Sequence, residues 1–126
     1  LLEASRGPDP TVALREGIRA TVDLYLSEYE VHRALYSLAR LGDEAVAAAI
    51  DRREEERTAG MAGIARRLAA RGHLRKGVGA TRAAHLLWVL TAFDTFDLLS
   101  NGRGLDADAI SDLLFETAER ALLASG

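Results

Sequence analysis

The stretch GHLRKGVG, from Gly72 to Gly79, lies between two long helical segments and is either a phosphate-binding loop or a turn. A P-loop has the order G-x-x-x-x-G-K-[ST] and follows a strand. Here the lysine precedes the glycine, no Ser or Thr adjoins it, and no flanking segment alternates like a strand. We therefore predict a turn in which Gly72 is left-handed, His73 and Arg75 lie near the last carbonyls of the preceding helix, and Gly79 precedes the next helix.

The composition describes an ordinary globular domain. The chain has 126 residues, of which 48% are hydrophobic and 28% charged, enough for one domain with a core. A net charge of -3 offers no basic surface for nucleic acid, and the absence of cysteine excludes disulfides and thiolate chemistry. No signal peptide and no apolar run long enough to span a bilayer is visible, so we expect a cytoplasmic protein without membrane contact.

Upstream of the turn, apolar residues recur at helical spacing. A first helix is predicted from Pro10, with Asp9 as its N-cap. The pattern continues past SEYE, but these four residues have the form of a capping box, so we place a break near Ser27 and a second helix to about Leu41. One bent helix fits the same pattern. A third helix is predicted from an N-cap at Asp43 to about residue 71.

The middle of this third helix, DRREEER (residues 51–57), has no large apolar side chain for two turns. Pairs such as Glu54 with Arg57 and Arg52 with Glu56 can stabilise an exposed helix, so a solvated stretch is one interpretation. In the other, the arginines reach toward a ligand or another domain.

Downstream of the turn, a fourth helix is predicted over residues 80–100. It is apolar on nearly every side between Ala83 and Phe93, so it needs more than one packing neighbour. NGRGLD ends this helix, and Asp106 caps a fifth helix that completes a C-terminal hairpin. The predicted fold is all-α, an orthogonal or antiparallel bundle of about five helices.

The sequence contains no recognisable catalytic or metal-binding constellation. His32, His73 and His85 never stand four residues apart, and none follows a glutamate by three residues as in di-iron bundles. No serine has a nucleophile-elbow context. Asp94 and Asp97 are one turn apart and could bring two carboxylates together, or could mark an exposed helix end. We expect no enzymatic activity, no cofactor and no metal.

The positive signal is a set of amphipathic side chains on apolar helix faces, each with an apolar body and one polar tip. They are Tyr25, Tyr29, His32, Tyr36, His85 and Trp88. If these faces turn toward one another, they line a small-molecule pocket. If they pack together, they form a core in which each tip binds backbone. Both interpretations remain open.

Residues 66–123 resemble the C-terminal ligand-binding and dimerisation domain of TetR-family (tetracycline-repressor-like) bacterial transcription regulators. The resemblance rests on GHLR, the capped helix AAHLLWVLT with Trp88 at its centre, the ending F-D-L-L, and the last helix LDADAISDLLFETAERALL. LREGIRATVDLYLSEYEVHRALYSLA resembles the family's preceding helix pair more loosely. The chain departs from the family in carrying Phe93 within TAFDTF and in lacking a proline at the start of the second helix.

The resemblance implies that residues 1–126 form the effector-binding and dimerisation domain of a regulator, with a repressor as the expected type. DNA would be bound by an N-terminal helix-turn-helix domain that we expect outside this sequence, which begins without methionine. The implied partners are a second copy of the chain and a small, mostly apolar effector. The alternative is a helical dimerisation or interaction module that binds no ligand.

Two residue sets follow from this resemblance. The expected ligand-binding residues are Tyr25, Tyr29, His32, Tyr36, Met61, Ile64, Leu68, His85, Trp88 and Thr91. The last two helices would form an isologous four-helix interface with their symmetry mates. Its expected residues are Leu87, Leu90, Asp94, Ile110, Leu113, Leu114, Thr117 and Ala121.

Overall fold

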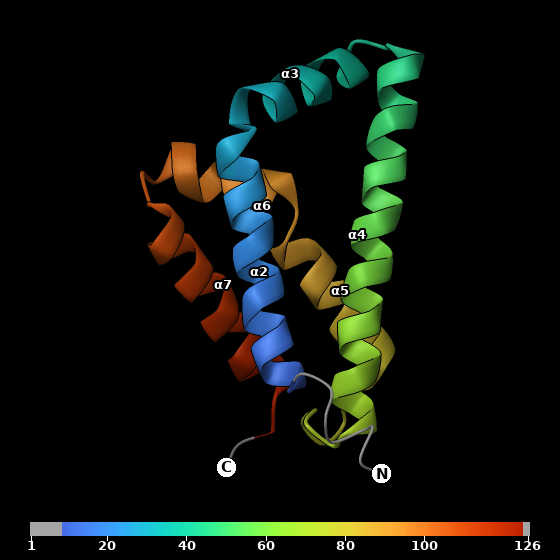
Figure 1. Cartoon of the computed structure of the whole chain (residues 1–126), viewed down its shortest axis with the longest axis vertical. Coiled ribbons are helices and arrows are strands. Elements are labelled where there is room, and N and C mark those ends of the chain that lie inside the picture. Colours follow the sequence, from blue (N-terminus) through green and yellow to red (C-terminus); the bar gives the residue numbers. More distant parts are fainter. Residues whose placement is uncertain (1–8, 125–126) are drawn as a thin grey trace.

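The computed structural model describes residues 9–124, and this part of the chain is all-α, which confirms the predicted fold class. Helix α3 (Tyr29–Arg40) bridges α2 (Pro10–Ser27) and α4 (Glu44–Ala70) at one end of the molecule, as Figure 1 shows. Helix α5 (Ala80–Leu90) packs against α4, and α7 (Ala107–Leu122) packs along α2. No described helix combines the length and apolar character that crossing a membrane requires.

Side-chain caps begin three of these helices where the sequence predicted them. The Asp9 carboxylate accepts a hydrogen bond from the Thr11 amide at 2.8 Å, and Asp43 accepts one from the Val46 amide at 3.0 Å. Asp106 caps α7 in the same way. Each cap satisfies an amide that the helix itself leaves unpaired.

The break between α2 and α3 lies at Glu28, next to the predicted position, but the predicted capping box is wrong. The Ser27 hydroxyl donates backward to the Leu24 carbonyl at 3.1 Å, and Glu28 makes no side-chain cap bond. The bend therefore depends on packing rather than on local capping.

The turn after α4 has the predicted left-handed glycine, since Gly72 has a φ of 72° and the His73 amide reaches back to the Leu68 carbonyl at 2.9 Å. The predicted position of Arg75 beside the α4 carbonyls is wrong. Its guanidinium donates to the Arg120 carbonyl at 2.5 Å, and its amide donates to the Leu122 carbonyl at 2.7 Å. The turn thus ties the end of α4 to the end of α7.

The predicted fourth helix over residues 80–100 is also wrong, because α5 ends at Leu90. Helix α6 (Phe93–Asp97) begins after an extended Ala92 and continues into the π-helical turn η1 (Leu98–Gly102). The break turns Phe93 and Phe96 inward, where they are 3% and 1% exposed. Burial of two aromatic rings outweighs the helical hydrogen bonds that are lost.

The main core lies where α2, α4, α5 and α7 meet. Its fully buried side chains include Leu14, Ile18, Leu68, Leu87 and Ile110. Helices α2 and α4 approach closely at Gly17, where a Cβ would lie 3.3 Å from Ile64 Cδ1. A larger residue at position 17 would therefore press on the core.

Candidate functional site

A cavity of about 430 Å³ lies between α2, α3 and α4, on the side of the molecule closed by α3. This volume is in the usual range for small-molecule sites. Four of the expected ligand-binding residues line it, namely Tyr25, His32, Tyr36 and Met61. Their role in binding stays a prediction, but the structure brings them to one space.

The opposite wall is the polar middle of α4, none of whose residues is among the expected ligand-binding residues. Residues Ile50, Glu54, Arg57 and Met61 follow one helix face and are partly or fully buried. The neighbouring wall residues Arg53, Glu56 and Gly60 are exposed, so they lie where the cavity opens to solvent. The interpretation of residues 51–57 as a wholly solvated stretch is therefore wrong for the face that carries Glu54 and Arg57.

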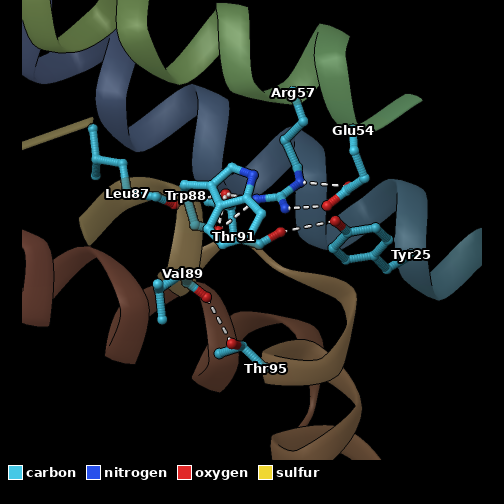
Figure 2. Close-up of polar contacts among 8 residues, drawn as sticks. All are labelled: Tyr25, Glu54, Arg57, Leu87, Trp88, Val89, Thr91 and Thr95. Carbon is cyan, nitrogen blue, oxygen red and sulfur yellow. Dashed lines mark hydrogen bonds and ion pairs between the residues drawn. The ribbon is translucent and has the colours of Figure 1, made fainter. Parts of the chain in front are cut away.

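Arg57 is the most extensively bonded polar side chain of the wall (Figure 2). It donates to Glu54 through Nε at 3.0 Å and Nη2 at 2.6 Å. Its Nη1 donates to the Trp88 carbonyl at 2.5 Å and to the Thr91 hydroxyl at 2.9 Å. These bonds use four of the five guanidinium donors. Burial opposes the charge, but the adjacent Glu54 carboxylate keeps the pKa of Arg57 above its ordinary value.

Carbonyls at the end of α5 accept hydrogen bonds from side chains of other elements, because the helix does not continue beyond Leu90. Tyr25 donates its hydroxyl to the Thr91 carbonyl at 2.8 Å, while the Thr95 hydroxyl donates to the Val89 carbonyl at 2.7 Å. With Arg57 on the Trp88 carbonyl, the last turn of α5 has partners from α2, α4 and α6. Two of these partners, Tyr25 and Arg57, also line the cavity.

The aromatic residues of α2 and α3 surround Phe93. Its ring stacks against His32 and Tyr36, with ring centroids 5.3 Å away in each case. Tyr29 packs on the same ring and donates its hydroxyl to Asp97 at 2.5 Å, and this bond raises the pKa of Tyr29. Burial raises the pKa of Tyr25 as well, so both phenols remain protonated at neutral pH.

Two polar tips in the cavity wall remain free. His32 Nδ1 lies 3.0 Å from the Glu28 carbonyl oxygen, so Nδ1–H donates to it, and in a neutral imidazole Nε2 is then an acceptor. The Tyr36 hydroxyl makes no hydrogen bond, and burial raises its pKa. Among residues 9–124, Ser111 Oγ is the one enclosed side-chain N or O atom without a partner. His32 Nε2 and the Tyr36 hydroxyl are therefore not enclosed, and both belong to residues that line the cavity.

The other six expected ligand-binding residues do not line the cavity, and the first of them, Tyr29, packs on Phe93 instead. Ile64 and Leu68 belong to the main core, and Thr91 lies behind the wall at 2% exposure. His85 is exposed, and Trp88 lines a separate, shallower groove together with residues of α4. Helix α5 does not face α3 as the pocket hypothesis required, because α6 and its phenylalanines occupy that position.

The expected interface residues divide between two faces. Leu87, Ile110 and Leu114 are buried within the chain's own core, at 4% exposure or less, so their side chains present almost no surface to a second copy. Leu90 is partly buried. The exposed members are Asp94, Leu113, Thr117 and Ala121. The exposed face of α7 differs from the predicted one because the face that carries Ile110 and Leu114 packs inside the chain, mainly against α2.

Asp94 and Asp97 do not form a carboxylate pair directed at one site, since Asp94 is exposed and Asp97 accepts from Tyr29. Within residues 9–124, no group of three or more His, Asp or Glu side chains is placed to hold a metal ion.

Comparison with known proteins finds no matching family model, no similar curated protein and no similar solved structure.

Proposed function

We propose that this chain is the effector-binding and dimerisation domain of a TetR-like transcription regulator, a cytoplasmic repressor that responds to a small, mostly apolar molecule. The cavity between α2, α3 and α4 is the observation that supports this proposal most. Its volume, and its lining of apolar and aromatic side chains with a few polar groups, are those of a small-molecule site. DNA would be bound by a separate N-terminal domain, as the sequence resemblance implies.

A route from the cavity to α5 supports a sensing role. Tyr25 and Arg57 line the cavity and also bind the last turn of α5. A ligand that shifts either side chain would change how this turn is held. Coupling of this kind requires the ligand to bind one arrangement more tightly than the other.

Dimerisation would use the faces of α5 and α7 that this chain leaves uncovered. Leu113, Thr117 and Ala121 are four residues apart on α7 and all exposed, and Val89 on α5 is 53% exposed. Two copies that pack these faces together would form an isologous four-helix interface.

A thermal-shift screen against metabolites and drugs tests the sensing role. A ligand that binds only the folded state raises its melting temperature, by an amount that grows with ligand concentration. If no compound shifts the melting temperature while the protein is dimeric, the ligand-free dimerisation module is the better account.

Light scattering tests the interface. We expect a dimer at micromolar concentration, and Leu113→Arg should yield a folded monomer because a charge cannot be buried unpaired. Leu41→Arg is the matched control, since Leu41 is 83% exposed at the end of α3 and outside the proposed interface. A monomeric wild-type chain, or a dimer unaffected by Leu113→Arg, would rule out this interface.

A further inference from the structure

At the mouth of the cavity, where it opens to solvent, the exposed wall residues Arg53 and Glu56 and the partly exposed Glu28 carry two negative charges and one positive charge. Arg53 Nη1 lies 3.9 Å from Glu28 Oε1, too far for a hydrogen bond. Glu56 forms no ion pair and no hydrogen bond with any described residue. Two carboxylates thus face one loosely paired guanidinium at the entrance.

The interior of the cavity has no free positive charge. Arg57 is already bound to Glu54, the Trp88 carbonyl and the Thr91 hydroxyl, so a ligand anion could reach its guanidinium only by displacing these partners. Breaking such a partly buried pair leaves a carboxylate without its cation, which is costly.

The rest of the cavity wall fits a ligand that is mostly apolar and has one hydrogen-bonding group. Leu35, Ile50 and Met61 supply apolar contacts, and Tyr36 offers a ring and a free hydroxyl. His32 Nε2, an acceptor, is the other free polar atom. Both free tips can accept a hydrogen bond from an N–H donor.

We propose that the cavity binds a lipophilic organic cation, a molecule with an apolar or aromatic body and one protonated amine. The body lies against Leu35, Ile50 and Met61, and the ammonium lies toward the mouth, near the carboxylates of Glu28 and Glu56. This inference rests on the proposed function and names the chemical class of its effector.

Three probes with one apolar body test the charge preference, namely 1-naphthylmethylamine, 1-naphthalenemethanol and 1-naphthoic acid. Calorimetric titration of the full chain at pH 7 should rank the amine tightest and the acid weakest. The amine should bind about threefold or more tightly than the alcohol, the usual size of a partly solvated charge contact.

Substitution at the mouth isolates the carboxylate contribution. Glu56→Gln should weaken amine binding about threefold and leave alcohol binding unchanged. Glu55→Gln is the matched control, because Glu55 is the adjacent exposed residue of α4 and does not line the cavity. It should change neither affinity.

The outcomes separate this inference from the proposed function. If the alcohol or the acid binds as tightly as the amine, or if Glu56→Gln acts like Glu55→Gln, the cation preference is wrong although the cavity binds ligands. If none of the three probes binds at millimolar concentration, the inference is also wrong, and the library screen decides the proposed function independently.

Discussion

The two ends of this helical bundle are stabilised in different ways. At the end where the main core lies, Leu14, Leu68, Leu87 and Ile110 are all 0% exposed. At the α3 end, the one buried residue of α3 is His32, and α4 has no buried residue before Met61. There the helices are joined by aromatic stacking and a few polar bonds around a cavity. The core end can therefore supply the stability while the α3 end adapts to a ligand.

The largest expected effect is loss of a core side chain. Leu68→Ala should lower the free energy of unfolding by about 3 kcal/mol, because the site is fully enclosed and leaves a void. Ile50→Ala at the cavity should cost less than about 1 kcal/mol, since Ile50 is partly exposed and already borders open space. Urea denaturation measures both, and equal losses would contradict the distinction between the ends.

At the α3 end of the bundle, we expect Arg57 to be the polar side chain that contributes most to stability, because it joins α4 to the end of α5. Arg57→Met removes its bonds to the end of α5 and leaves Glu54 without its cation, so we expect a loss of about 2 kcal/mol. Arg52→Met is the matched control, because Arg52 is exposed on the same helix and forms no ion pair with any described residue. Its effect should stay within about 0.5 kcal/mol, and similar losses from the two variants would show that the link contributes little.

The tyrosines should differ according to whether their hydroxyls are bonded. Tyr25→Phe removes a buried bond to the Thr91 carbonyl and should cost about 1 kcal/mol. Tyr36→Phe removes a hydroxyl that binds nothing in the free protein and should change stability little. Thermal unfolding of the two variants distinguishes these cases, and a Tyr36→Phe loss as large as that of Tyr25→Phe would mean that its hydroxyl is bonded.

The pH dependence of stability gives a test, with a smaller expected effect, of the buried and bonded state of the Tyr25 hydroxyl. Burial raises the pKa of Tyr25 above its unfolded value of 10.0, so the folded state keeps a proton that the unfolded state loses. This contribution is complete below pH 10 and is lost as the pH rises further. The stability difference between wild type and Tyr25→Phe should therefore shrink between about pH 10 and 11, as urea denaturation at each pH would show. A constant difference would contradict the assigned burial effect.

Local signals in the sequence predicted most helix boundaries. Asp9, Asp43 and Asp106 are capping residues, and Gly72 is a helix-ending glycine, so each acts within a few residues of its own position. The break after α5 has no such signal. It depends on the burial of two phenylalanines and on partners from α2 and α4, and neither follows from the local pattern.

The candidate site was predictable in part. Amphipathic spacing indicated Tyr25, His32 and Tyr36, because an apolar face with polar tips is visible in the sequence. The α4 wall could be predicted only as one of two alternatives, because a charged stretch has the same pattern whether one face is solvated or turned inward. The α7 register depends on which face α2 covers, so Leu113 could not be distinguished from Leu114 by periodicity alone.

The central claim is that the cavity between α2, α3 and α4 binds the effector. Ile50→Trp should place a large ring in this space without displacing the main core, because Ile50 lines the cavity and is only partly buried. The deciding measurement is the melting-temperature shift that the tightest ligand from the screen produces in wild type and in this variant. We predict a clear shift for wild type and none for an Ile50→Trp protein that still melts cooperatively at a similar temperature. An undiminished shift in the filled variant would contradict the account.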